Sequence, residues 1–243
     1  MASDGFGGFY MCGESPVYYV DPEGFTHFIA GASDRGYAGD GGPATQALLT
    51  QPWDVAVDRD GNLFIADTNN NRIRRVDKQS GIITTVAGGG PLNGFEGYGH
   101  GSFCGDGGPA LQACFNTPFS LGVDPFGDIF ISDYYNGRLR KVDARGIITT
   151  LRDMTGQGSF GKILTDAYGG LFVQRDHRFE WHRDDELRRQ LRRQRIVHCH
   201  GAATDCNRNG YRADVRQARS LSPPRRSSLI MRGAARPRRG SLD

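Results

Sequence analysis

The sequence predicts an all-β fold built from a repeated four-stranded unit, and three observations support that prediction. The chain repeats itself at an offset of 66 residues, first seen from Gly39 to Gly105. Asp and Gly recur at turn positions between short apolar runs rich in β-branched residues. Glycine accounts for 35 of the 243 residues and hydrophobic residues for only 37%, a composition that disfavours helix bundles. Four short strands per repeat are typical of the blades of a β-propeller.

Two copies of the repeat are complete. In the first copy, an Asp-Arg-Asp-Gly turn at 58–61 joins two short apolar strands into a hairpin, and an Asn-rich loop leads to the third strand. The second copy keeps this order, with one residue deleted in its last turn. The expected strands of the first copy are 55–58, 63–66, 72–76 and 82–87. These copies predict blades at 52–88 and 118–151.

Partial copies stand at both ends of the repeat region, at 8–31 and 160–174. The first matches the second, third and fourth strands of a blade, so we expect the chain to begin inside a blade. The last matches only the first hairpin, with Asp166 and Gly169 at the positions of Asp58 and Gly61. The sequence therefore predicts about thirteen strands, or three to three and a half blades, over residues 1–174. Because bare blade faces destabilise an unclosed propeller, we expect an open arc whose final blade is least ordered.

These residues resemble NHL repeats of the subtype in which a Gly-Asp-Gly-Gly-Pro-Ala insert precedes the blade, as in teneurin-like and many bacterial propellers. The motifs Pro-x-x-x-x-Val-Asp, Gly-x-Leu/Ile-Phe-Ile, Ser/Ala-Asp, Asn-x-Arg and Gly-Ile-Ile-Thr-Thr recur in that order, and the resemblance covers about 170 residues. It implies a ring of six blades, of which about half is absent here. It also implies a non-catalytic scaffold whose blade loops bind a protein or another macromolecule.

The charge pattern divides the chain near Gln174. Residues 175–243 hold 18 Arg, no Lys and eight acidic residues, whereas residues 1–174 carry an excess of acids. We expect this Arg-rich tail to be mostly disordered, with one short helix at 184–195. Arg clusters neutralise phosphate, so one alternative function is nucleic-acid binding through the tail. Another explanation for the composition is that the reading frame leaves the repeat near Gln174.

Two motifs that suggest nucleotide or calcium binding depart from the patterns that such sites require. The insert at 39–44 lacks the Lys-Ser/Thr of a phosphate loop, and we expect a turn in which Pro begins a short helical segment, at 44–49 and again at 110–115. Asp58 to Asn62 resembles the start of a calcium loop, but Asn69 stands where a Glu is needed. We therefore assign no catalytic, cofactor-binding or metal-binding residue, and no small-molecule substrate.

The Asp and His residues that could take part in acid–base or zinc chemistry also match no catalytic pattern. Asp67 and Asp133 each precede an Arg by five residues, Arg72 and Arg138, and their recurrence favours a structural hydrogen bond or ion pair. The lyases among NHL propellers hold zinc with His from several blades, whereas the histidines here occupy unrelated blade positions: His27, His100, His177 and His182. The sequence thus predicts no enzyme. The alternative is a fragment of a propeller lyase or hydrolase whose catalytic blades are missing.

The cysteines give a weak signal. Cys104 and Cys114 flank the second insert, and we expect free thiols there, with a loop disulfide and an oxidising compartment as the alternative. The group His198-Cys199-His200 with Cys206 lacks the spacing of zinc ligands.

Two further features concern contacts and location. The loop from Gly88 to Cys104 is expected to be disordered, with a contact surface as the alternative; its aromatic and His residues are Phe95, Tyr98, His100 and Phe103. No apolar run reaches the roughly 18 to 20 residues of a membrane span, and the first residues lack a signal-peptide pattern. NHL proteins are often secreted or at the cell surface, so the localisation stays open.

Overall fold

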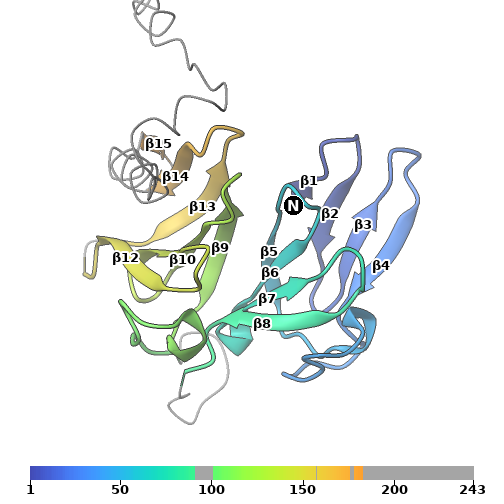
Figure 1. The fold of residues 1–243 in the computed structure, drawn as a ribbon, viewed down its shortest axis with the longest axis horizontal. Helices are drawn as coiled ribbons and strands as arrows, with labels where there is room; N and C mark the ends of the chain where they lie inside the picture. The colour runs from blue at the N-terminus through green and yellow to red at the C-terminus, as the bar shows by residue number, and fades with distance from the viewer. Residues whose placement is uncertain (91–100, 157, 176–177, 183–243) are drawn as a thin grey trace, which may run out of the picture. The chain divides into compact units, whose positions relative to one another are not determined.

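The computed structural model describes residues 1–90, 101–156, 158–175 and 178–182. These residues form an all-β, partial propeller with four antiparallel sheets, coloured in chain order from blue to orange in Figure 1. The strands are β1 (Ala2–Ser3), β2 (Phe9–Cys12), β3 (Val17–Val20), β4 (Thr26–Ala30), β5 (Pro52–Val57), β6 (Leu63–Asp67), β7 (Arg72–Val76), β8 (Ile83–Ala87), β9 (Pro118–Val123), β10 (Ile129–Asp133), β11 (Arg138–Val142), β12 (Ile148–Asp153), β13 (Phe160–Thr165), β14 (Leu171–Arg175) and β15 (Arg178–His182).

Each sheet is one blade, and its strands pair in chain order, so the predicted propeller architecture is confirmed. The first sheet is β1–β4, the second β5–β8, the third β9–β12 and the fourth β13–β15. The fourth sheet therefore has three strands among the described residues.

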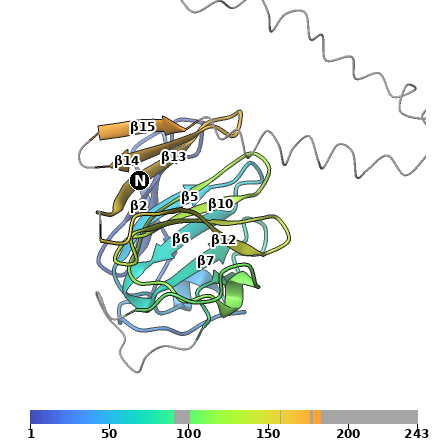
Figure 2. The ribbon, with the colours of Figure 1, turned by 90° about the vertical axis from the view of Figure 1, so that its left-hand side faces the viewer.

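The described residues form fifteen strands, two more than the roughly thirteen expected, and one of the two lies beyond the expected repeat region. Ala2–Ser3 pairs with β2, which makes the first blade four-stranded, and β15 pairs with β14 over five residues after the repeat motif has ended (Figure 2). A strand needs only a backbone partner in register, so both additions form without the motif. The expected helix at 184–195 and the rest of the Arg-rich tail lie outside the described residues.

An Asp in the turn of the first hairpin stabilises that turn in each blade. Asp58 accepts the backbone N–H groups of Asp60 and Asn62 on one carboxylate oxygen, both at 2.9 Å, and Gly61 supplies a φ of +84°. This is the turn chemistry expected of Asp and Gly. The same pair of hydrogen bonds is made by Asp4, Asp124 and Asp166. Asp143 makes the same pair in the β11–β12 turn, so the pattern marks blade turns in general. Asp4 is such a turn residue, and the sequence analysis missed it.

The core consists of clusters between neighbouring blades. Alternate residues of β6 face opposite ways, as a strand requires. Ile65 packs in the cluster shared with the first blade, and Phe64 packs in the cluster shared with the third. The two central blades are thus packed on both faces.

The inserts before the second and third blades add to these clusters. Each contains a 3-10 turn, η1 (Ala44–Gln46) and η3 (Ala110–Gln112), and Ala44 and Ala110 are buried in the interblade clusters. The predicted helical turns are confirmed, although each spans three residues where six were expected. The remaining helical segment, η2 (Thr68–Asn70), is also a three-residue turn. No helix among the described residues is long and apolar enough to cross a membrane.

Cys104 and Cys114 form a disulfide, so the expectation of free thiols is wrong. Their counterparts in the other insert, Ala38 and Leu48, pair as an isolated antiparallel bridge. The backbone of the insert therefore already brings the two positions together. The Cα atoms of the two cysteines lie 4.8 Å apart, within the range that a disulfide spans.

Candidate functional site

Three side chains from consecutive blades meet on the first strands of those blades. Asp54, Ser120 and Lys162 each lie four residues before the turn Asp of their blade, and we name them the inner cluster. The Ser120 hydroxyl donates to Asp54 Oδ2 at 2.5 Å, and Lys162 Nζ donates to Asp54 Oδ1 at 2.5 Å. Asp54 therefore joins the second, third and fourth blades.

The inner cluster has further partners, among them the N-terminal amine of Met1, which lies 3.7 Å from Asp54 Oδ1. Asp54 Oδ2 also accepts the Leu121 backbone N–H at 3.2 Å, while Ser120 Oγ accepts that of Ile163 at 2.9 Å. The Asp54 side chain is 4% exposed, and that of Lys162 is 30% exposed. Both carboxylate oxygens of Asp54 are therefore engaged, one by Lys162 and the other by the third blade. The geometry is that of a clamp between blades.

Buried carboxylates recur at the ends of β6 and β10. Asp67 accepts from the Asn70 side-chain amide nitrogen, which lies 2.9 and 2.8 Å from its two oxygens, and from the backbone N–H of Thr50 at 2.9 Å. The same amide nitrogen also donates to the Gly36 carbonyl at 2.7 Å. Arg74 completes the group at 3.3 Å. Asp133 makes the corresponding contacts in the third blade. Burial raises the pKa of both carboxyl groups to about 6, against the lowering effect of the amide and Arg partners.

The Arg that pairs with each buried Asp is not the one nominated from the sequence. Asp67 pairs with Arg74, whereas Arg72 lies against the ring of Tyr37, with its guanidinium carbon 3.9 Å from the ring centroid. In the third blade, Phe103 takes the place of Tyr37. Its ring centroid lies 3.7 Å from the guanidinium carbon of Arg138, and Asp133 pairs with Arg140. The structural interpretation of these acids holds with this change of partner.

Phe103 was also one of the four side chains considered for a contact surface on the loop from Gly88 to Cys104. It covers the Arg138 guanidinium and is 38% exposed. The other three, Phe95, Tyr98 and His100, lie outside the described residues.

A row of aromatic side chains runs across the second and third blades. Ring centroids are 4.9 Å apart from Trp53 to Phe119, 5.2 Å from Phe119 to Tyr134 and 5.3 Å from Tyr134 to Tyr135. Trp53 and Tyr135 are 46% and 49% exposed. We name these four residues the aromatic row. Sequence reasoning missed it, although Trp53 and Phe119 stand at the same position of the repeat.

A β-bulge in the first strand of each blade explains why Trp53 and Phe119 lie outside the regular pleat. The register of β5 against β6 shifts between Pro52 and Asp54, which leaves Trp53 outside the ladder. The same shift in the third blade frees Phe119. A bulge re-aims a side chain away from the regular pleat. In both blades the re-aimed residue is a large aromatic.

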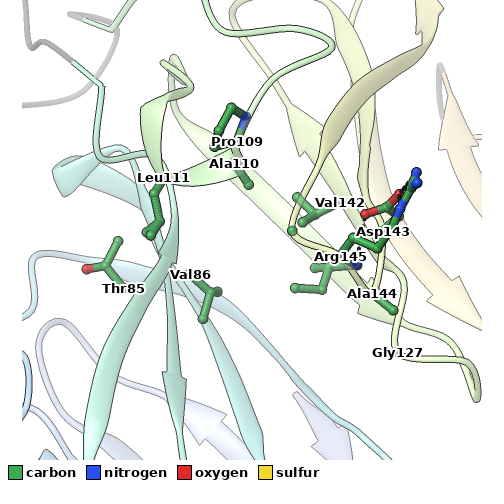
Figure 3. Close-up of a pocket in the computed structure, with 12 residues that line it drawn as sticks. Thr85, Val86, Pro109, Ala110, Leu111, Gly127, Val142, Asp143, Ala144 and Arg145 are labelled. Atoms are coloured by element: carbon green, nitrogen blue, oxygen red, sulfur yellow. Dashed lines mark hydrogen bonds and ion pairs between the residues drawn. The ribbon is translucent and has the colours of Figure 1, made fainter.

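A cavity of about 440 Å³ opens between the second and third blades (Figure 3). Its apolar wall includes Val86, Leu111 and Val142, and Arg145 lies at its side. The two full blades differ in a side chain at this place. In the second blade, a Cβ on Gly61 would lie 3.3 Å from Lys78 Cγ, whereas the third blade has Ala144 at that position, and a Cβ on Gly127 would meet nothing within 4 Å.

Metal ligation finds little support in the part of the chain that the structure describes. No group of three or more His, Cys, Asp or Glu side chains there is placed to hold an ion. The calcium-like segment at 58–62 is a hairpin turn in which Asp58 is occupied by backbone N–H groups. The segment His198-Cys199-His200 with Cys206 lies outside the described residues.

This geometry, with antiparallel blades and a repeated insert, is that of a partial β-propeller. A family model described as the teneurin NHL domain matches residues 30–95. Teneurin-1 of Gallus gallus is 32% identical over 129 residues, which are 51% of this chain and 4% of that protein. Teneurin-4 of Homo sapiens is 35% identical over 102 residues, 40% of this chain and 4% of that protein. Part of this chain is therefore similar to the NHL domain of teneurins, as its motifs predict, and the chain spans only a small part of these relatives' length.

Solved structures give weaker likenesses. A structure of streptogramin B lyase aligns with 74% of this chain and 52% of its own, at 15% identity and a TM-score of 0.47. A structural-genomics protein from Bacteroides thetaiotaomicron aligns with 51% of this chain and 29% of its own, at 28% identity and a TM-score of 0.42.

Proposed function

We propose that this chain is a non-catalytic binding module that contacts a protein partner through the aromatic row. The observation that carries the proposal is the exposure of Trp53 and Tyr135 at the two ends of a continuous set of rings. Because Trp and Tyr are the side chains most enriched at energetically important points of protein interfaces, such a row suits protein recognition. The rings support one another, so little side-chain entropy is lost on binding.

The side chains that could act as nucleophiles or bases are engaged in structural contacts, which supports a non-catalytic role. The Ser120 hydroxyl and the Lys162 ammonium are both engaged by Asp54. Burial raises the pKa of the Cys12 thiol to about 12, which suppresses the thiolate that a nucleophile needs. Each of these groups stabilises the fold in its present arrangement and is poorly prepared for catalysis.

The disulfide between Cys104 and Cys114 indicates where the partner is to be sought. Disulfides persist in oxidising compartments and are rare in the cytosol. The proposed partner is therefore a secreted or cell-surface protein.

The test is a binding screen of the full chain against arrayed secreted and cell-surface proteins, followed by titration of each protein that binds. Trp53→Ala and Tyr135→Ala are each expected to weaken binding about 30-fold, equivalent to about 2 kcal/mol, as at other interface hot spots. The matched control is Phe126→Ala, which removes an aromatic ring of similar exposure, 49%, from the β9–β10 turn. Binding that falls equally in the control, or that survives loss of both row residues, contradicts the proposal.

A further inference from the structure

The cavity between the second and third blades is lined mostly by apolar groups. Val86 of β8 and Leu111 of the insert lie on one side, and Val142 and Ala144 of the third blade lie on the other (Figure 3). The volume of about 440 Å³ is within the range of about 300–1,000 Å³ that small-molecule sites occupy. Leu111 is 53% exposed, although its side chain is large and apolar. A ligand in the cavity would cover this side chain.

The second blade shows which kind of group lies at the corresponding place. The backbone N–H of Lys78 donates to the Asn62 side chain at 3.0 Å. That of Ala144 donates to the Asp128 side chain at 3.2 Å, so Lys78 and Ala144 hold the same position of the repeat. The Cγ and Cδ atoms of Lys78 would lie 3.3 and 3.7 Å from a Cβ on Gly61. An unbranched aliphatic chain therefore lies across this glycine in the second blade.

Two differences leave the third blade less filled and more apolar at this place. Ala144 has no chain to lie across Gly127, and a Cβ on that glycine would meet nothing within 4 Å. Leu111 stands where the other insert has Thr45, which adds a large apolar group to the wall of the cavity. The third blade thus lacks an aliphatic chain and has additional apolar surface. Both differences favour an apolar ligand with the shape of the missing chain.

The charged groups of the lining are already paired with each other. Arg145 donates from Nε at 3.0 Å and from Nη2 at 2.7 Å to one oxygen of Asp143. The other oxygen accepts the backbone N–H groups of Arg145 and Ile147, at 2.9 and 3.0 Å. A charged ligand would have to compete with this pair. A hydroxyl group, which both donates and accepts, can form hydrogen bonds beside the pair without displacing either side chain.

We propose that this cavity binds a free, neutral, unbranched aliphatic alcohol, with its chain between Leu111 and Ala144 and its hydroxyl group toward Arg145. The chain of the alcohol takes the place that the stem of Lys78 holds in the second blade. No residue of the aromatic row lines the cavity, so this inference does not depend on the proposed protein contact.

The experiment is a titration of the full chain with n-butanol, n-pentanol and n-hexanol, followed by the NMR signals of the Val and Leu methyl groups. We expect the signals of Leu111 and Val142 to shift. The dissociation constant is expected to fall about fourfold for each added methylene, as burial of about 0.8 kcal/mol per CH₂ requires. Hexylammonium and hexanoate are expected to bind about tenfold more weakly than n-hexanol, because their charges must be desolvated. An affinity that does not rise with chain length, or charged chains that bind as tightly as the alcohol, overturns the inference.

Two matched variants test the place of binding. Ala144→Met lays an unbranched apolar chain across Gly127, and it is expected to weaken the binding of n-hexanol about tenfold or more. The converse double substitution, Lys78→Ala with Thr45→Leu, copies the third blade in the second. It is expected to add a second site, seen as a new shift of the Val76 signal. All three positions are exposed, and circular dichroism and the unfolding midpoint check that each variant folds.

The control is Gln79→Met, which adds the same side chain at an exposed position of the β7–β8 turn and is expected to leave the binding of n-hexanol unchanged. Binding that survives Ala144→Met, binding that falls equally in the control, or a converse variant without the second site overturns the inference. Co-sedimentation with phosphatidylcholine vesicles separates a free alcohol from the acyl chain of a lipid. We expect the protein to stay in the supernatant. Co-sedimentation that is lost in Ala144→Met overturns the assignment to a free ligand.

Discussion

Asp54 accepts hydrogen bonds from two other blades, and its removal tests the inner cluster at the scale of one residue. Asp54→Ala leaves the Ser120 hydroxyl and the Leu121 N–H without their buried acceptor. It also leaves Lys162 without its counter-charge, although that side chain can still reach water. We expect a loss of about 2 kcal/mol in the free energy of unfolding, measured by urea denaturation.

The control for this substitution is Asp60→Ala, which removes an exposed carboxylate from the neighbouring turn and is expected to cost about 0.5 kcal/mol or less. In the background of Lys162→Met, the loss caused by Asp54→Ala should shrink, because the ion pair is already gone. Equal losses in both backgrounds would show that the two side chains do not stabilise each other.

Asp67 and Asp133 give the chain a pH dependence with a defined sign. Burial raises the pKa of each carboxyl from 3.8 to about 6, so the folded chain binds these protons more tightly than the unfolded chain. Their effect on stability is therefore most favourable below pH 4 and is lost as pH rises through about 6. Asp133→Asn should flatten the change in urea midpoint between pH 5 and pH 7. A midpoint that rises over that range in both proteins contradicts this assignment.

At the scale of elements, the two inserts differ mainly in how their ends are joined. The insert before the third blade is closed by Cys104 and Cys114, and the insert before the second by the bridge between Ala38 and Leu48. A loop of this length predicts that the disulfide contributes about 3 kcal/mol. Reduction should lower the thermal midpoint of the wild type. Cys104→Ala with Cys114→Leu copies the other insert and should be insensitive to reductant, with a smaller loss of stability than reduction causes.

The strands could be predicted where the repeat motif sets their turns and pattern. The expected strand at 72–76 is the observed β7, and the hairpin around Asp58 is as predicted. β15 was missed because its residues carry no motif and are recruited only by backbone pairing with β14. The inner cluster and the aromatic row were also missed. They join residues from different blades, yet Trp53 and Phe119 share one repeat position, and Asp54, Ser120 and Lys162 share the next.

At the scale of the whole described chain, core packing is unevenly distributed between blades. The central strands β6 and β10 contribute side chains to clusters on both of their faces, through Ile65 and Phe64 in one case and Ile131 and Phe130 in the other. The first blade contributes to one cluster, through residues such as Tyr10. Repeat proteins in which each unit contacts only its neighbours open locally where these interfaces are fewest. The inner cluster opposes such opening, because Asp54 joins three blades at once.

Hydrogen exchange distinguishes local opening of the first blade from unfolding of all blades together. In dilute solution we expect the amides of β6 and β10 to exchange last and those of β2 to exchange earlier. Leu49→Ala removes a fully buried side chain from the cluster between the first two blades, at an expected cost of about 2–5 kcal/mol. Because β2 packs in that cluster and β10 does not, exchange should accelerate more in β2 than in β10. A uniform acceleration across all four sheets would instead show that the clamp at Asp54 makes the blades unfold as one cooperative unit.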